Sequence, residues 1–417
     1  MNRGKAKIPA SISLPEGLHD LQSIVAKALG EVQPAGSPAS DNESRGLMLS
    51  SRTEGGRNLP QYFLVYFTLV DLLKFYHMGQ WEKTAWTVPI RFRGRLYGIE
   101  HRKMGLGIFA PTLEPGARMS APPSEEAEAD AVEICELVRA AVAAATPYFE
   151  WRALQAASTS QLNVLNKSSE LFDRFEHFRG EFQRLAEASQ EARRAARTES
   201  EGTSAFDPPS RRSIDHWLAA RRISMESRWS AQAAIEAYFS WTEHAFIHIA
   251  ILQGRLRVGT DVAEIAAADW KAKFKVALDL TNTETKKHYD VLLDIRAQLR
   301  NFLAHGAFGK NGEAFLFHSG AGAVPLLLTD DQRHRYALTS NPAFDETWAL
   351  RAIEDFTTHL WTGQRLHARR YIFSNLPTIL SLAADGTYER SMRSEAAMDS
   401  LVERLTHSFD AALDMDW

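Results

Sequence analysis

Residues 289–306 read YDVLLDIRAQLRNFLAHG, and this stretch decides how the C-terminal half of the chain folds. At 100° per residue, one face gathers apolar side chains, namely Leu292, Ile295, Leu299, Phe302 and Leu303. A second face gathers polar ones, namely Asp294, Gln298, Asn301 and His305. Gly306, directly after His305, suits a left-handed helix terminus. The pattern predicts an amphipathic helix that packs on a core and ends near His305.

Three polar side chains near the end of this helix are suited to acid–base chemistry. The imidazole of His305 titrates near neutrality and can give or take a proton. Asn301, one turn earlier, can orient that ring or hold a phosphate oxygen, and Arg300 supplies a permanent cation whose donors match phosphate. RNA carries its own nucleophile, the 2′-hydroxyl, so its cleavage needs a base, an acid and a cation but no metal-bound water. These residues predict a metal-independent RNA-cleaving site with no cofactor.

The motif at residues 300–306, RNFLAHG, resembles the Arg-x(4–6)-His signature of HEPN domains, in which Asn commonly follows the Arg. The resemblance covers roughly residues 213–372. It implies an all-α bundle of four or five helices, usually dimeric, and catalytic roles for Arg300 and His305 with Asn301 in support. Many members of that family are metal-independent endoribonucleases of toxin–antitoxin, CRISPR-associated and abortive-infection systems. One subgroup has Tyr two residues after the His, whereas this chain has Ala307.

A single histidine cannot conveniently serve as both base and acid in one step. Two copies of the helix, facing each other across a two-fold axis, would supply both groups. We therefore expect a homodimer that forms through the C-terminal helical bundle, with RNA as the substrate.

Glu243 stands out because it shares a helical stripe with Phe239, Phe246 and Ala250. A carboxylate on an apolar face requires a partner, and the candidates are Arg296, Arg300 and His305 on the neighbouring predicted helix. Such an ion pair would orient the site. The alternative is a carboxylate that turns to solvent or bonds to a purely structural residue.

His244 and His248 have the i, i+4 spacing that can hold a metal ion. No Glu-x-x-His arrangement or third ligand accompanies them, so we predict no metal site.

Two groups of basic residues are candidates for binding nucleic acid. The first interleaves with the aromatic residues Phe92, Tyr97 and His101 and comprises Arg91, Arg93, Arg95, Arg102 and Lys103. The second stands near the start of the bundle and comprises Arg211, Arg212, Arg221, Arg222 and Arg228. We expect Arg221 and Arg222 to bind RNA. The alternative for both groups is a solvated charged face.

We predict an N-terminal α+β domain over residues 1–155. Residues 31–60 are rich in Gly, Ser, Pro, Asn and Asp and predict a mobile loop, and a helix follows over 60–78. Residues 86–110 predict a small antiparallel sheet, because apolar residues alternate along them. An Ala-rich stretch with acidic residues in its first turn predicts a helix over 125–145.

A long connecting helix is expected over 160–198. Its stripe steps by four and three residues, through Leu171, Phe175, Phe178, Phe182 and Leu185. That spacing fits either a dimer seam or packing on the chain's own helices. Residues 199–210 form a break rich in Ser and Pro, where we expect the domain boundary.

The C-terminal half predicts an up-and-down helical bundle over 211–375, followed by a helical extension over 376–417. The bundle helices are expected at 213–253, 261–279, 285–305 and 345–370. Two short strands, 314–317 and 324–328, interrupt the bundle before its last helix. The fold class is therefore mainly α, with an N-terminal α+β domain and a C-terminal HEPN-like bundle.

Composition sets the outer limits. The 417 residues are 45% hydrophobic and 24% charged with a net charge of −4, which is typical of globular proteins and implies no general polyanion-binding surface. Cys135 is the only cysteine, so an intrachain disulfide, a CxxC pair and a thiolate-rich zinc site are excluded. We expect a cytoplasmic protein with no secretion signal and no membrane contact. Walker, GxGxxG, GxSxG and HExxH motifs are absent, so nucleotide hydrolysis and hydride transfer lack support.

These observations predict a metal-independent endoribonuclease that acts by 2′-hydroxyl attack at a dimeric composite site. Its expected biological role is a toxin or an anti-phage, abortive-infection effector, with the N-terminal domain sensing a trigger or restraining the nuclease. The alternative is a non-catalytic module of the same type that binds RNA, a nucleotide or a protein. A third reading places an activity in the N-terminal half, around residues 91–103.

Overall fold

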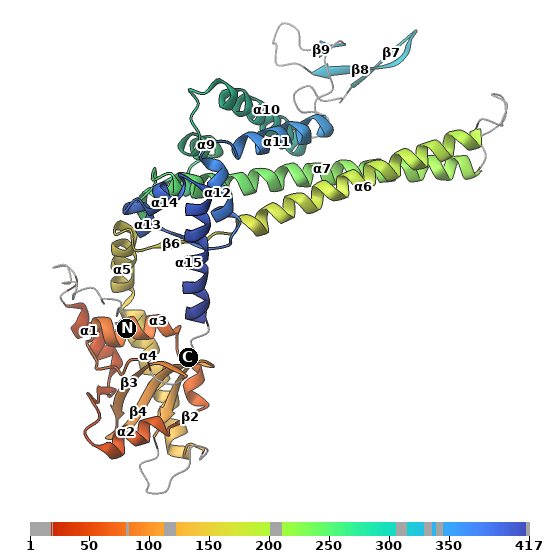
Figure 1. Ribbon diagram of the computed structural model, residues 1–417. Helices are drawn as coiled ribbons and strands as arrows, with labels where there is room; N and C mark the ends of the chain where they lie inside the picture. Colours follow the sequence, from red (N-terminus) through yellow and green to blue (C-terminus); the bar gives the residue numbers. More distant parts are fainter. Residues whose placement is uncertain are drawn as a thin grey trace. The chain divides into compact units, whose positions relative to one another are not determined.

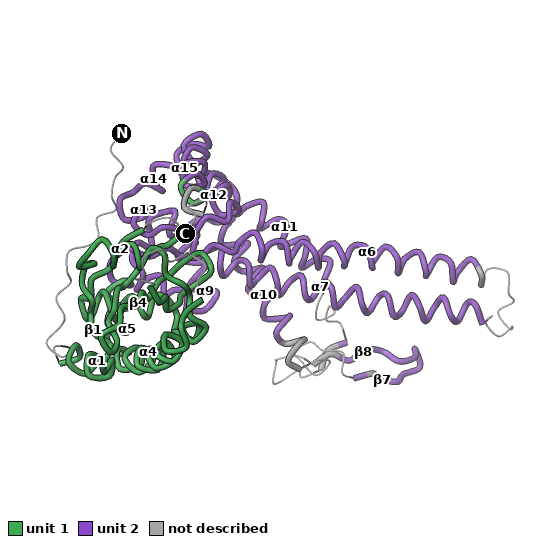
Figure 2. Tube along the Cα trace, turned by 90° about the horizontal axis from the view of Figure 1, so that it is seen from below, with its two compact units in different colours: residues 1–156, 408–417 green, residues 157–407 purple. Residues whose placement is uncertain are grey.

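The computed structural model describes residues 18, 20–80, 83–111, 122–200, 211–305, 315–328, 336–338 and 345–413. The protein is mainly helical, with a small antiparallel sheet of five strands in the N-terminal region. The chain divides into two compact units, residues 1–156 with 408–417 and residues 157–407 (Figure 2). Across the described ranges, no helix is long and apolar enough to span a bilayer.

The first unit is built around the antiparallel sheet, whose strand order is β1-β3-β4-β5-β2. The strands are β1 (Gln33–Pro34), β2 (Ser51–Arg52), β3 (Thr84–Phe92), β4 (Arg95–Arg102) and β5 (Gly105–Ala110). The turn between β3 and β4 uses Arg93 and Gly94, both at positive φ, which matches the right-handed twist of a tight hairpin. The alternation of Val88, Ile90 and Phe92 correctly predicted β3, and all three side chains are buried.

The helices of the first unit differ in part from the prediction. They are α1 (Leu21–Leu29), α2 (Asp41–Met48), the 3₁₀ turn η2 (Gly55–Asn58), α3 (Tyr62–Tyr66), the π-helical turn η3 (Phe67–Leu72), α4 (Glu125–Ala144) and α5 (Thr146–Ser158). The predicted helix over 60–78 is thus shorter and ends in a π-helical turn. The predicted loop over 31–60 contains α2, because the Ser40 hydroxyl accepts from Glu43 N–H and caps the helix.

The second unit is organised by two long helices, α6 (Ser168–Ser200) and α7 (Arg211–Leu252), which lie side by side (Figures 1 and 2). They run antiparallel, since Phe172 contacts Trp241 near one end and Ser189 Oγ donates to Ala220 O further along. The apolar stripe of α6 therefore packs on the chain's own α7. The expected domain boundary at 199–210 is wrong, because the helices on both sides of it belong to the same unit.

Shorter helices pack around the C-terminal half of α7. They are α8 (Gly259–Ala267), α9 (Trp270–Ala277), α10 (Thr283–His305), α11 (Glu346–Leu360) and α12 (Arg365–Ile372). The predicted helix over 261–279 is divided, because Asp269 leaves the helical conformation and its carboxylate accepts from Ala272 N–H to cap α9. The core between these helices is aromatic, with Trp241, Phe246, Trp270 and Phe274 fully buried.

The remaining elements of the second unit are short strands and C-terminal helices. They are β6 (Asn163–Val164) paired with β10 (Thr378–Ile379), the sheet β7 (Phe315–Ser319), β8 (Gly322–Leu328) and β9 (Tyr336–Ala337), and the helices α13 (Leu380–Ala384), α14 (Thr387–Ser391) and α15 (Glu395–Leu413). The last residues of α15, from 408 on, belong to the first unit. The two strands predicted inside the bundle correspond to β7 and β8.

Candidate functional site

A groove of about 1310 Å³ opens along the C-terminal half of α7, beside α9 and α10. We call it the Arg300 groove. Its lining residues are Glu236, Phe239, Ser240, Glu243, Asp269, Lys271, Leu293, Asp294, Arg296, Ala297, Leu299 and Arg300. Three residues singled out in the sequence, Glu243, Arg296 and Arg300, therefore lie together.

Glu243 is held by two cations. Its Oε2 accepts from Lys273 Nζ at 2.8 Å, and its Oε1 accepts from Arg296 Nη2 at 3.2 Å. The side chain of Lys273 is only 8% exposed. The sequence predicted that Glu243 needs a cationic partner and named Arg296 as a candidate, and this ion pair is present. Lys273 is the partner that the sequence analysis missed.

The helical positions around Lys273 carried a signal that could have revealed it. In α9, Trp270, Phe274 and Ala277 form the buried face. Lys273 lies between Trp270 and Phe274 on that face, and a lysine there requires an acid. The alternating lysines of WKAKFKVA make the pattern hard to read, because Lys271 and Lys275 are ordinary exposed positions.

Arg296 is fixed from several sides. Its guanidinium carbon lies 5.8 Å from the ring centres of both Phe239 and Trp270. A planar cation that rests against aromatic rings and donates to a carboxylate has little freedom to reorient. The ion pair with Glu243 therefore ties α10 to α7 one helical turn before Arg300.

Arg300 is exposed in the same groove. Within the described ranges, its side chain forms no ion pair or hydrogen bond, whereas Arg296 is bound to Glu243. Lys271 is the other cation lining the groove that has no acidic partner among those residues. Two of the groove's acids are engaged, since Asp269 caps α9 and Asp294 accepts from Gln298 Nε2 at 2.7 Å. The groove is lined by four carboxylates as well as three cations, and Arg300 and Lys271 are the two cations without a carboxylate partner among the described residues.

The other two residues of the predicted catalytic set, Asn301 and His305, follow Arg300 in α10. The helix α10 continues to His305, so Asn301 and His305 both belong to it. Their side chains lie outside the described residues, and so does Gly306. Their contact with Arg300 or with each other stays a prediction.

His244 and His248 bond to each other rather than standing as free ligands. Lys167 N–H donates to His244 Nε2 at 2.9 Å, and that same nitrogen lies 3.0 Å from His248 Nε2. The shared proton is therefore on His248, whose Nδ1 accepts from the Thr378 hydroxyl at 2.6 Å. Burial lowers the pKa of His248 to about 3. The described residues contain no group of three or more His, Cys, Asp or Glu that could hold a metal ion.

The basic residues of the N-terminal sheet are paired with acids. Arg91 binds Glu43, Arg93 binds Glu133, Arg95 binds Asp130 and Arg102 binds Glu100. Two of these carboxylates, Glu100 and Asp130, are buried, so their arginines are held against the sheet, and each of the four guanidinium groups already has a carboxylate partner.

The two arginines that were expected to bind RNA, Arg221 and Arg222, have different surroundings. Arg222 forms an ion pair with Glu226 at 3.3 Å, one turn further along α7. Arg221 lines a second groove, between α6 and α7, where its guanidinium carbon lies 5.8 Å from the ring centre of Trp217.

No protein-family model matches the chain, and no curated protein or solved structure matches it either.

Proposed function

We propose that the protein is a metal-independent endoribonuclease of the HEPN type, with Arg300 and His305 as its catalytic residues. The bundle of that type is formed by α7, α9, α10 and α11. The observation that carries the proposal is Arg300 itself. It is exposed and lines a groove, it has no acidic partner in the described part of the chain, and it is on the same unbroken helix as His305.

The proposed reaction is an attack of the RNA 2′-hydroxyl on the adjacent phosphorus. His305 of one copy removes the hydroxyl proton, and the P–O5′ bond breaks as His305 of the second copy protonates the leaving oxygen. Arg300 stabilises the negative charge that builds on the phosphorane oxygens, because the spacing of its N–H donors matches that of phosphate oxygens. Asn301 is one residue further along and acts in support. The products are a 2′,3′-cyclic phosphate and a free 5′-hydroxyl.

Glu243 and Arg296 are positioning residues in this scheme. Neither needs to touch RNA. Their ion pair holds α10 against α7 directly before Arg300, and the rings of Phe239 and Trp270 keep Arg296 in place. Catalysis that depends on a fixed cation requires such support, since small displacements of the cation weaken its contact with the developing charge.

The proposal is tested by incubating the purified protein with total RNA in EDTA and analysing the fragment ends. We expect fragments with 2′,3′-cyclic phosphate from the wild type. We expect the activity to fall at least a hundredfold in both His305→Ala and Arg300→Gln. His407→Ala, which changes an exposed histidine of α15, is the matched control and should cleave normally.

A folded, dimeric His305→Ala protein that still degrades RNA would refute the enzymatic role. In that case the alternative, a non-catalytic module that binds RNA, a nucleotide or a protein, becomes the better account. Toxicity on expression in cells should follow the same pattern if the protein acts as a toxin or an anti-phage effector in the cytoplasm. The N-terminal unit would then restrain the nuclease or sense its trigger.

A further inference from the structure

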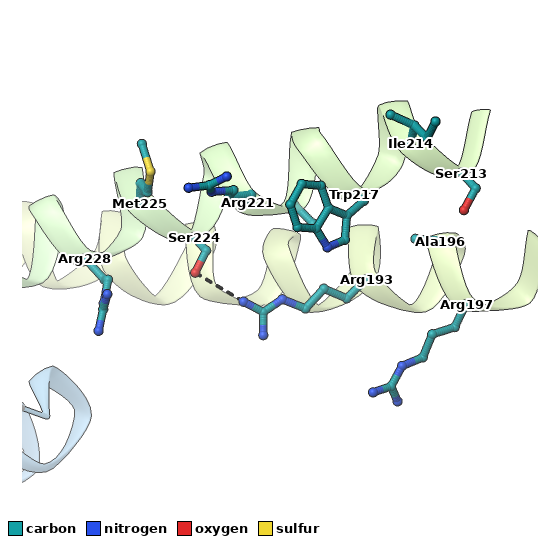
Figure 3. A pocket seen from close by; sticks show the side chains of 11 residues that line it. Arg193, Ala196, Arg197, Ser213, Ile214, Trp217, Arg221, Ser224, Met225 and Arg228 are labelled. Carbon is teal, nitrogen blue, oxygen red and sulfur yellow. Dashed lines mark hydrogen bonds between the residues drawn. The ribbon is translucent and has the colours of Figure 1, made fainter. Parts of the chain in front are cut away.

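A second groove, of about 830 Å³, lies between α6 and α7 toward the ends of the two helices that adjoin residues 201–210. We call it the hairpin groove. Figure 3 shows its lining side chains, which come from both helices. They are Arg193, Ala196, Arg197, Ser213, Ile214, Trp217, Ala220, Arg221, Ser224, Met225 and Arg228.

The charge of the hairpin groove is strongly one-sided. Four of its described lining residues are arginines and none of these residues is acidic, although the whole chain has a net charge of −4. Arg193 donates to Ser224 Oγ at 3.3 Å, a neutral partner (Figure 3). Within the described ranges, Arg193, Arg197 and Arg221 have no carboxylate at ion-pair distance. The groove therefore attracts an anion with several charges.

The same groove exposes an aromatic surface. Trp217 is 56% exposed, and the guanidinium of Arg221 lies near its ring. Ile214 and Met225 are exposed beside it. An indole left open to water between arginines is suited to stacking with a planar base, while the guanidinium groups bind phosphates. Arginine and tryptophan together thus match the two chemical parts of a single-stranded nucleic acid.

The hairpin groove and the Arg300 groove face the same side of α7. At about 100° per residue, Trp217 and Arg221 in the first groove and Phe239 and Glu243 in the second fall within about 80° of each other. At a rise of about 1.5 Å per residue, Arg221 and Ser240 are about 28 Å apart along the helix. Between the two grooves the first turn of α11 covers part of this face, since Glu346 lies 3.6 Å from Arg228 and accepts from Gln232 at 3.5 Å.

We propose that the hairpin groove binds single-stranded RNA, with a base stacked on Trp217 and phosphates held by Arg193, Arg197 and Arg221. The choice of RNA over DNA rests on the proposed function. RNA bound there is held on the same helix that lines the Arg300 groove, so the hairpin groove raises the local concentration of single-stranded substrate. Duplex RNA, whose bases are already stacked, binds less well there.

A second copy of the chain is the competing occupant of the groove. In a two-fold contact through this surface, the same patch would face itself, and the arginines of one copy would lie against those of the other. Like charges brought together in this way oppose association. The charge therefore favours a polyanion over a second copy.

The test measures binding separately from cleavage. A fluorescently labelled 12-nucleotide RNA of mixed sequence is titrated in EDTA into the full-length His305→Ala protein, which should bind without cutting. Fluorescence anisotropy gives Kd at several salt concentrations. We expect Trp217→Ala to weaken binding about tenfold. Arg193→Gln together with Arg221→Gln should weaken it by a similar factor and reduce the salt dependence by about two counterions.

Arg184→Gln is the control, since Arg184 is exposed on the opposite face of α6, about 180° from Arg193, and forms an ion pair with Glu181 within its own helix. It should leave Kd unchanged. Equal Kd values for Trp217→Ala, the double arginine variant and the control would overturn the proposal. So would a change of oligomeric state in sedimentation with no change in RNA affinity, because that result assigns the groove to a subunit contact.

The two proposals fail in different ways. If wild-type protein binds the RNA through the hairpin groove but does not cut it, the proposed nuclease activity is refuted and the proposed RNA-binding role of the groove is retained. If wild-type protein cuts RNA and Trp217→Ala changes neither Kd nor the KM for cleavage, the RNA-binding role of the groove is refuted and the nuclease activity is retained.

Discussion

Lys273 shows how strongly single residues constrain this fold. An ammonium group that is almost inaccessible to water is tolerated only where an acid compensates it, and here Glu243 does so. The sequence predicted the need of Glu243 for a partner from its apolar neighbours, but not which of several cations would provide it. That choice depends on how α9 and α10 approach α7, which helical periodicity does not specify.

We predict that Glu243→Gln destabilises the protein by roughly 2 kcal/mol, because it leaves the charge of Lys273 without compensation. Urea denaturation measures the loss. Glu236→Gln, an exposed acid of the same groove, should cost far less. Combining Glu243→Gln with Lys273→Met should recover part of the stability. Equal unfolding curves for the two glutamate variants would contradict this account of the ion pair.

His248 should make stability depend on pH. Burial, with a contribution from His244, lowers its pKa to about 3 in the folded state, whereas the ordinary value is 6.5. The unfolded chain therefore binds a proton that the folded chain rejects. The stabilising effect of the neutral ring is complete above pH 6.5 and is lost as the pH falls toward 3.

Between pH 7 and pH 5 we expect this group alone to remove about 2 kcal/mol of unfolding free energy. The His248→Gln variant should lack that part of the pH dependence. The exposed His407→Gln should keep it. The prediction is checked by denaturant unfolding at several pH values, and it fails if His248→Gln and wild type lose stability in parallel. The ring of His248 also contacts His244, whose Nε2 in turn accepts from the Lys167 backbone N–H.

At the scale of elements, periodicity predicted helices well and short or irregular segments poorly. The limits of α7 and α10 were predicted to within about two residues, because each has a long apolar face. The helix α2 was missed, although Ser40 and Glu43 have the spacing of a capping box. Its eight residues include a glycine and five polar or charged side chains, and such composition resembles a loop.

The apolar stripe of α6 illustrates a different limit. Its spacing fitted both a dimer seam and an internal contact, and only the three-dimensional structure distinguishes them. Phe175, on that stripe, is 1% exposed against α7 and touches the ring of Tyr238. The spacing of apolar residues along a helix identifies its apolar face, but it does not show whether the same chain or a second chain covers that face.

We predict that Phe175→Ala lowers the unfolding free energy by about 3–5 kcal/mol, as expected when a buried ring is removed from a packed core. Phe178→Ala, on the same stripe but only half-buried, should cost less. Thermal unfolding followed by circular dichroism at several protein concentrations separates the two explanations. A loss that appears only at low concentration would point to a contact between chains instead.

At the scale of the whole molecule, the proposed chemistry requires two chains. A composite site predicts that RNA cleavage per chain falls as the protein is diluted below the dissociation constant of the dimer. Activity measured over a hundredfold range of concentration, alongside sedimentation, tests this expectation. Activity strictly proportional to concentration through the monomer range would argue for a site within one chain.

The candidate site could be predicted only in part from the sequence. Arg300 and Glu243 were identified from local patterns, since a motif and an acid on an apolar face can both be recognised along one helix. The hairpin groove could not, because Arg193 and Arg197 on one helix meet Trp217 and Arg221 on another only after α6 and α7 pair. Distant residues that share no motif become a site through packing alone.

One consequence follows from the continuity of α7 beneath both grooves. Each residue of an unbroken helix adds a fixed rise and a fixed rotation, so the number of residues between the two grooves sets both their distance and their relative orientation. Adding one alanine between Arg228 and Glu236 would turn one groove by about 100° against the other while lengthening the interval by only about 1.5 Å. An insertion would thus change the relative orientation of the grooves far more than the distance between them. Substitutions in this interval leave the number of residues unchanged, so they would preserve both.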